Sequence, residues 1–148
     1  MTTHVAFRTY SPRDREICLA IFDANCPEFF APNERADYEI FFDLEPAGYE
    51  LCLSDGDIVG AYGLIGEESK CRSLNWILLS RQAQGLGLGS ILIERAISLA
   101  KEAKLACINI AASHLSANSF AKYGAVSICE LKNGWGPGMH RIDMELQL

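Results

Sequence analysis

A strand predicted over residues 73–79 is followed by a glycine-rich segment and then by a helix, and this arrangement constrains the fold more than any other feature of the sequence. The segment reads QGLGLGS over residues 84–90, with glycine at 85, 87 and 89. Because glycine has no Cβ atom, the backbone can turn tightly there and bring its N–H groups close to a ligand. The N–H groups in the first turn of the following helix lack partners and carry a partial positive charge. We therefore predict an anion site suited to phosphate, with a flexible turn that binds no ligand as the alternative.

Two common phosphate-binding motifs fit this segment poorly. A P-loop ends in a lysine followed by serine or threonine, and the segment contains no lysine. A dinucleotide fingerprint requires GxGxxG, whereas the possible alignments put Ser90 or Leu92 in place of the third glycine. The acidic residue expected about twenty positions later to bind a ribose is also missing from residues 106–112. Both nucleotide-binding motifs are therefore disfavoured.

Hydrophobic periodicity and turn residues predict the other elements. Strands are expected over residues 4–9, 49–54, 58–65, 73–79, 106–111, 126–131 and 140–146. Helices are expected over residues 11–25, from residue 34 to before Pro46, and over 90–103 and 115–123. The chain thus combines an antiparallel meander with a strand–helix–strand crossover. We predict a mixed α/β (α+β) fold, in which about four helices flank a central mixed, mostly antiparallel sheet.

The same patterns predict which residues are buried. Helical spacing predicts an inner face of the first helix made of Ile17, Ala20, Ile21 and Ala24. Alternation predicts that residues 49–54 form a strand buried on one side only. In the strand over 73–79, it puts one set of side chains on a single face, namely Leu74, Trp76 and Leu78.

Composition bounds the domain organisation and the partners. The 148 residues, 49% hydrophobic and 22% charged, are typical of one folded domain over residues 1–148. Thirteen basic and nineteen acidic side chains give a net charge of −6, which argues against nucleic-acid binding. The sequence contains no apolar run near the ~20 residues of a membrane span and begins without the apolar stretch of a signal peptide. We expect a cytoplasmic protein with no nucleic-acid or membrane partner, and with a homodimer as a possible assembly.

The cysteines and histidines are interpreted without a metal. The chain has six cysteines and three histidines, and no two cysteines form a CxxC pair. Several cysteines fall in apolar patterns, and in a reducing compartment they are expected to be small buried apolar residues. These cysteines are Cys18, Cys26, Cys52, Cys71, Cys107 and Cys129. No spacing among them and the histidines suggests a zinc site, so we predict that no metal is bound.

At the glycine-rich segment the sequence resembles the GNAT superfamily of N-acetyltransferases. The cofactor motif of that family is Gln or Arg, two residues, Gly, one residue, then Gly or Ala, placed between a strand and a helix. Gln84, Gly87 and Gly89 match this motif. The order of predicted elements matches the family over most of the chain. The resemblance implies the acyl-CoA N-acyltransferase fold of the GNAT family, with acetyl-CoA as cosubstrate.

The resemblance also implies which residues contact the coenzyme. In family members the loop amides bind the pyrophosphate, and the pantetheine arm follows the end of the preceding strand. A backbone amide near Leu79 would then be the natural donor to the oxyanion. The contacts implied for this chain are Ile77, Leu78, Leu79, Gln84, Gly85, Leu86, Gly87, Leu88, Gly89, Ser90, Ser113 and Phe120.

The sequence departs from the family pattern at the catalytic acid. Many members have an asparagine and then Tyr-x-x-x-Gly-Phe, whose tyrosine protonates the departing sulfur. Here Ser113 replaces the asparagine and Phe120 the tyrosine. A positioned acid contributes about 10²–10⁴ in rate, yet a thiol with a pKa of about 8.5 leaves tolerably as a thiolate near neutral pH. Tyr123 is the preferred substitute, with packing at the helix end as its alternative role; the other nearby hydroxyls belong to Ser116 and Ser119.

An amine acceptor must lose a proton before it attacks a thioester, so a base is expected. Candidates are His140, which has a suitable pKa range, and Glu67 and Glu68. A loop that anchors the last strand is the alternative role for His140, and a solvated hairpin is the alternative for the two glutamates. The connection over residues 25–35 is expected to border the acceptor pocket. Its side chains suited to a cationic amine with an apolar body are Phe29, Phe30, Glu28 and Glu34.

The resemblance therefore implies an acyltransferase. It would transfer the acetyl group of acetyl-CoA to a primary amine of a small molecule or peptide by direct attack, without an acyl-enzyme intermediate. The alternative is a non-catalytic acyl-CoA sensor or interaction module that kept the coenzyme site and lost the acid at Phe120. A third possibility is a protein that uses the same fold as an interaction surface and has no affinity for CoA.

Overall fold

The structure is a computed structural model, and it describes residues 4–66 and 70–148. Within these ranges the strands form one seven-stranded sheet in the order β1-β2-β3-β4-β5-β7-β6. Only the β4–β5 pair is parallel among the described strands. The prediction of a mixed, mostly antiparallel sheet is confirmed. The strands are β1 (Val5–Thr9), β2 (Tyr49–Ser54), β3 (Asp57–Ile65), β4 (Cys71–Leu79), β5 (Cys107–Ser113), β6 (Val126–Gly136) and β7 (Met139–Gln147).

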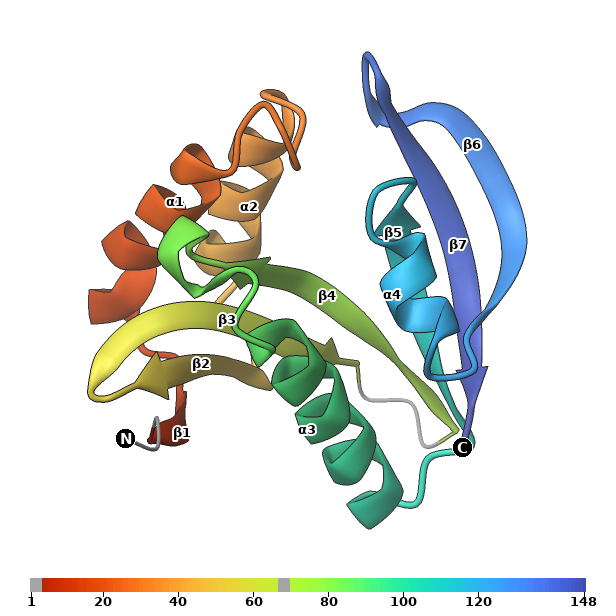
Figure 1. The fold of residues 1–148 in the computed structure, drawn as a ribbon, viewed down its shortest axis with the longest axis horizontal. Coiled ribbons are helices and arrows are strands. Elements are labelled where there is room, and N and C mark those ends of the chain that lie inside the picture. The colour runs from red at the N-terminus through yellow and green to blue at the C-terminus, as the bar shows by residue number, and fades with distance from the viewer. Residues whose placement is uncertain (1–3, 67–69) are drawn as a thin grey trace.

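Helices cover both faces of the sheet, which we call the α1–α2 side and the α3–α4 side (Figure 1). Short 3-10 helices, η1 and η2, precede α1 and the glycine-rich segment. None of the helices in the described part of the chain has the length and apolar composition needed to cross a bilayer. The helices are η1 (Pro12–Asp14), α1 (Arg15–Ala24), α2 (Glu34–Asp43), η2 (Arg81–Ala83), α3 (Leu88–Glu102) and α4 (Ala117–Ala121).

The sheet splits between β4 and β5. Their parallel pairing joins Cys71–Leu74 to Cys107–Ile110, near the start of each strand. Beyond that pairing the two strands diverge, so β1–β4 form one arm of a V and β5–β7 form the other (Figure 1). The end of β4 and the segment that follows it therefore lie at an opening in the sheet.

A bulge in β4 changes which side chains share a face. The pairing of β3 with β4 skips one residue, because Ala61 pairs with Leu78 and Gly63 with Asn75. Trp76 lies in this bulge with φ of +48°. One extra residue inverts the alternation of the strand. The prediction that Leu74, Trp76 and Leu78 share one face is therefore wrong for Leu74, which packs on the α3–α4 side while the other two pack on the α1–α2 side.

The buried face of α1 is turned relative to the prediction. Ile17 is 45% exposed, whereas Phe22 is fully buried. Phe22 packs against aromatic rings from other elements, and this packing sets the rotation of the helix. The residues that are buried also have helical spacing, so periodicity alone could not distinguish the predicted buried face from the observed one. The buried residues of α1 are Cys18, Ile21 and Phe22.

Strand β2 is covered on both faces, unlike the half-buried strand predicted. Leu51 belongs to the core of the α1–α2 side and Cys52 to the core of the α3–α4 side, and both are fully buried. A central strand between two helical layers has no solvent face, so alternation of polarity in the sequence is a weak guide there.

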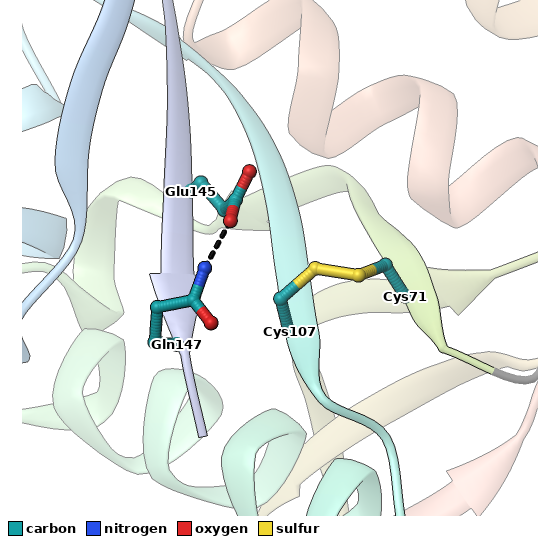
Figure 2. Close-up of a disulfide and its surroundings, with 4 residues drawn as sticks. All are labelled: Cys71, Cys107, Glu145 and Gln147. Carbon is teal, nitrogen blue, oxygen red and sulfur yellow. Dashed lines mark hydrogen bonds between the residues drawn. A yellow bond between two sulfur atoms is a disulfide. The ribbon is translucent and has the colours of Figure 1, made fainter.

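Two of the six cysteines form a disulfide, which corrects the expectation of unpaired thiols. Cys71 and Cys107 face each other across the parallel pair, with their Cα atoms 4.7 Å apart (Figure 2). They are 36 residues apart in sequence, and only the strand–helix–strand crossover brings them together. Cys18 and Cys52 are buried as expected, whereas Cys129 is exposed.

Candidate active site

A cavity of about 580 Å³ lies at the opening between β4 and β5. Its walls include Phe120 and Leu92 from the α3–α4 side, and Phe30 and Trp76 from the α1–α2 side. Because β4 and β5 are not paired at their diverging ends, the cavity reaches both faces of the sheet. A ligand held on one side can therefore meet a second ligand that enters from the other side.

The glycine-rich segment forms an open turn at the start of α3. Gly85 and Gly87 have φ of +82° and +79°, a region that side chains with a Cβ atom rarely adopt. A Cβ atom built at either position would meet nothing within 4 Å, so this backbone faces open space. Among the described residues, none accepts a hydrogen bond from the backbone N–H groups of residues 85–87. These donors, together with the first turn of α3, could bind an anion such as a diphosphate.

The residues predicted to contact the coenzyme divide into two groups. One group lines the cavity: Ile77, Leu78, Leu79, Gln84, Gly89, Ser113 and Phe120. The other group forms the turn and the first residues of α3 beside it: Gly85, Leu86, Gly87, Leu88 and Ser90. Within the second group the side chain of Leu88 is buried in the protein, so only its backbone could face a ligand. The structure thus brings the two groups together along one path.

Asn25 joins the end of β4 to the glycine-rich segment. Its side chain is 2% exposed. The Nδ2 group of Asn25 donates to the carbonyl oxygens of Ile21 and Leu79, at 2.8 Å and 2.9 Å. The Nε2 group of Gln84 donates to Oδ1 of Asn25 at 2.7 Å. Sequence reasoning gave Asn25 no such role, because Leu79 and Gln84 are far away from it in the chain.

Glu34 brings a buried carboxyl group to the α1–α2 side of the cavity. It lines the cavity and is only 4% exposed. Burial raises the pKa of Glu34 from 4.5 to about 7, while the hydrogen bond from the Ala31 N–H, 2.7 Å long, acts to lower it. The group can therefore exchange a proton near neutral pH. Sequence reasoning placed Glu34 in the acceptor pocket and did not consider it as a base.

The two candidate catalytic residues lie elsewhere in the described structure, outside the cavity walls. Tyr123 directs its hydroxyl group toward Oε1 of Glu94 on α3, at 3.4 Å. Nδ1 of His140 accepts a hydrogen bond from the N–H of Asn133 at 3.0 Å, and the His140 ring packs against that of His114. Both placements match the structural alternatives considered for these residues.

Several further candidates can be placed. Ser116 and Ser119 line the cavity beside Phe120, and Oγ of Ser116 accepts a hydrogen bond from the N–H of Ser113 at 3.1 Å. Glu28 forms an ion pair with Arg81 at 2.6 Å, and both side chains are well exposed. The other candidate bases, Glu67 and Glu68, lie outside the described residues.

The described residues include no cluster of three or more His, Cys, Asp or Glu side chains that could hold a metal ion.

Comparison with known proteins identifies the class. A family model described as the acetyltransferase (GNAT) family matches residues 18–125. The chain belongs to this family, and the family resemblance predicted from the sequence is confirmed. Among curated protein sequences no significant match is found.

Solved structures share the fold over nearly the whole chain. Ard1 from Thermoplasma volcanium has a TM-score of 0.80 at 18% identity, covering 97% of each chain. The ribosomal-protein-S18-alanine N-acetyltransferase from Escherichia coli has a TM-score of 0.79 at 15% identity, covering 97% of this chain and 94% of its own. A GNAT family acetyltransferase from Elizabethkingia anophelis, solved with acetyl-CoA bound, has a TM-score of 0.69 at 18% identity, covering 99% and 98%. At these identities the similarity establishes the GNAT fold.

Proposed function

We propose that this protein transfers the acetyl group of acetyl-CoA to a primary amine. The observation that carries the proposal is one cavity that borders an open turn suited to an anion and also reaches a buried carboxyl group. Gly89 and Gln84 line the first end, and Glu34 lines the second. A coenzyme and an amine that entered from opposite sides of the sheet would meet between β4 and β5.

The coenzyme end fits a diphosphate attached to an extended arm. The open turn at Gly85 and Gly87 offers backbone donors without side chains in the way. The diverging end of β4, over residues 77–79, would face the pantetheine arm with backbone groups that the split leaves without a strand partner on the β5 side. The hydrogen bonds of Asn25 hold this strand end in place. The arrangement supports binding of acetyl-CoA along β4, with its thioester inside the cavity.

The acceptor end supplies a base. An ammonium group has no lone pair, so it must lose a proton before attack. Glu34, with its pKa raised to about 7, is ionised in a large fraction of molecules at neutral pH and can accept that proton. We propose Glu34 as the general base, in preference to His140, which hydrogen-bonds to Asn133 instead.

The transfer step balances with groups in this chain. Acetyl-CoA supplies an activated thioester. The neutral amine attacks its carbonyl carbon, a C–N bond forms, the C–S bond breaks, and the electron pair of that bond leaves on sulfur. A backbone N–H near Leu79 would stabilise the oxyanion. The amine reaches this step neutral, after Glu34 has taken its ammonium proton and released it to solvent. The second proton, on the nitrogen that has attacked, then passes to Glu34, and the thiolate leaves without a tyrosine at position 120.

An acyl-CoA-binding module is the second candidate. The buried Phe120, 4% exposed, supports it, since this residue stands where many family members carry their catalytic acid. Such a module would bind acetyl-CoA and release no thiol in the presence of amines.

One experiment separates the two candidates. Purified protein is mixed with acetyl-CoA and a panel of amino acids, polyamines and peptides, while free thiol is followed and acetyl-CoA binding is measured by calorimetry. Amine-dependent thiol release that is lost in Glu34→Gln, with binding retained, supports the transferase. Binding without release on every amine supports the module. Absence of binding at millimolar acetyl-CoA would refute both.

A further inference from the structure

The part of the cavity on the α1–α2 side has walls from both arms of the V. Residues paired across a sheet point to the same face, and alternate residues point to opposite faces. Ser113 pairs with Arg141, whereas the adjacent pair, Ala112 and Ile142, packs in the core of the α3–α4 side. Ser113 and Arg141 therefore face the α1–α2 side, as Glu34 does. We call this space the acceptor chamber, lined by Phe30, Glu34, Trp76, Ser113, Trp135 and Arg141.

A direct contact ties the two walls of the acceptor chamber together. Nδ2 of Asn33 donates to the carbonyl oxygen of Trp135 at 2.7 Å, over a separation of 102 residues. A Cβ atom built on Gly136 would lie 2.6 Å from Cβ of Ala31, so the hairpin joining β6 and β7 approaches this closely only because residue 136 is glycine. The contact limits the width of the chamber and suits a compact acceptor better than an extended polypeptide.

Arg141 presents a positioned cationic group in this chamber. Its Nε donates to Oδ1 of Asp143 at 2.7 Å, and its guanidinium carbon lies 5.0 Å from the centre of the Trp135 ring. The described residues offer no hydrogen-bond acceptor to its two terminal nitrogens. These nitrogens form a planar fork that matches the two oxygens of a carboxylate. Arg141 is also the only basic residue among the described cavity walls.

The remaining walls are apolar between the two charged groups. The rings of Phe30 and Trp76 stack with centroids 6.4 Å apart, and Trp135 lines the same cavity from the other arm. Glu34 belongs to the β1–β4 arm and Arg141 to the β5–β7 arm. A ligand that satisfies all of these groups carries an amine at one end, a carboxylate at another and an apolar body. The net charge of −6 would repel an anion, so a carboxylate needs such a local cation.

We propose that the acceptor is a small amino acid with an apolar body, whose carboxylate binds the terminal nitrogens of Arg141 while its amine faces Glu34. The inference rests on the proposed acetyltransferase function and specifies its substrate class. It makes Arg141 a specificity-determining residue. A long peptide is disfavoured as the acceptor, because its free carboxylate lies far from its N-terminal amine.

The test uses matched acceptors that differ only in the carboxylate. Phenylalanine is compared with phenylalaninamide and phenethylamine, and 6-aminohexanoate with hexylamine, so that two spacings of amine and carboxylate are sampled. The wild-type kcat/KM is expected to favour at least one of the two acids over its matched amines by about 10- to 100-fold, as a charged bidentate contact supplies. Arg141→Gln should remove this preference mainly by raising KM for the acid. It should change KM for acetyl-CoA and the turnover of phenethylamine and hexylamine much less than it changes KM for the acids, and Arg141→Lys should restore part of the preference.

Arg15 provides a matched control. Its Nη1 nitrogen pairs with Asp43 at 2.6 Å, and its guanidinium carbon lies 6.0 Å from the Phe42 ring centre, yet Arg15 lies outside the cavity walls. Arg15→Gln removes a similar ion pair and aromatic contact, so it should keep the preference for acids. Loss of the preference in both variants would mean that general destabilisation is the cause, and the inference would be overturned.

The failures of the two proposals are distinguishable. If amines without a carboxylate, or long peptides, are acetylated as well as the amino acids, the transferase stands and the inference is overturned. If no amine in the panel is acetylated, the proposed function fails, and the inference is decided by saturation-transfer NMR of phenylalanine and 6-aminohexanoate in the presence of CoA. Binding of either that is lost in Arg141→Gln supports carboxylate recognition, and absence of binding by both overturns it.

Discussion

The two ends of the cavity are built in different ways. Most of the coenzyme end is contiguous, because the end of β4, the glycine-rich turn and the start of α3 all lie within residues 77–90, and only Ser113 and Phe120 lie outside this range. The acceptor chamber is assembled from α2, β4, β5, β6 and β7, and Glu34 and Arg141 are far apart in sequence. A contiguous site leaves a motif that can be recognised in a sequence. An assembled site leaves none, although its residues decide which substrate is used.

The largest expected effect tests whether the acceptor chamber holds the base. Glu34→Gln keeps the shape of the side chain and an oxygen for the Ala31 N–H, but it cannot accept a proton. We expect kcat to fall by about 10²–10⁴. Acetyl-CoA affinity should be unchanged, because the coenzyme end is separate. In the wild type, kcat should rise with pH through about 7 as Glu34 ionises, and this dependence should vanish in the variant. An unchanged kcat would show that Glu34 is not the general base.

The second prediction concerns the disulfide that joins the two arms where they still pair. Replacing Cys71 and Cys107 by serine opens a loop that spans a sequence separation of 36 residues and contains the end of β4, the glycine-rich turn and α3. We expect the free energy of unfolding to fall by about 2–4 kcal/mol in denaturant titrations under oxidising conditions. Replacing the exposed Cys129 by serine serves as the control and should change stability little. Equal stability of the double variant and the wild type would show that the bond does not form.

The third prediction follows from the pKa of Glu34. Because this pKa is about 7 in the folded chain and near 4.5 in the unfolded chain, the folded state binds more protons between these pH values. The free energy of unfolding of the wild type should therefore decline as pH rises from about 4.5 to about 7, by about 1–3 kcal/mol. Glu34→Gln should lack this part of the decline and should exceed the wild type in stability at pH 8. Chemical denaturation at several pH values measures the free energy of unfolding of both proteins. The same dependence of this free energy on pH in the wild type and the variant would contradict the prediction.

The smallest effect is expected at the glycine-rich turn. Gly87 adopts φ of +79°, where an alanine costs about 1–2 kcal/mol. Gly87→Ala should weaken acetyl-CoA binding about tenfold, as measured by calorimetry, because the turn shifts its backbone donors. Gly56 in the β2–β3 hairpin is a matched control, since its φ is +89° and a Cβ atom there also meets nothing within 4 Å. Gly56→Ala should cost similar stability and leave binding intact. Equal binding by both variants would argue against a diphosphate at this turn.

The prediction from sequence succeeded where local chain geometry decides structure. Periodicity predicted the order of the elements and which of them are strands or helices. Gln84, Gly87 and Gly89 indicated the family. It failed where one inserted residue or one rotation matters. Trp76 in the β4 bulge moved Leu74 to the opposite face, and aromatic packing around Phe22 turned α1.

The candidate site also contains residues that are close in sequence and residues that are far apart. Residues 77–79 and the turn after them were named from sequence and lie together along the cavity. Tyr123 and His140 were chosen for their chemistry and their place in the chain, yet their side chains hydrogen-bond to Glu94 and Asn133. Glu34 was read only as part of an acceptor loop, because neither its burial nor its pKa can be inferred from a sequence pattern. The single-domain organisation, the cytoplasmic location and the homodimer stay predictions.

By itself the sequence determined the secondary structure, the mixed sheet and the backbone turn that could bind an anion, because each of these depends on neighbouring residues and on glycine conformation. The tertiary structure alone decided that Glu34 is buried, that Asn25 bridges β4 and Gln84, and that Arg141 faces the same chamber as Glu34. Burial and the approach of distant charges depend on how the two arms of the sheet diverge. The physical reason is that the pKa of Glu34 and the position of the Arg141 guanidinium depend on the groups around them in space. Strand pairing and side-chain packing across the whole sheet bring those groups together.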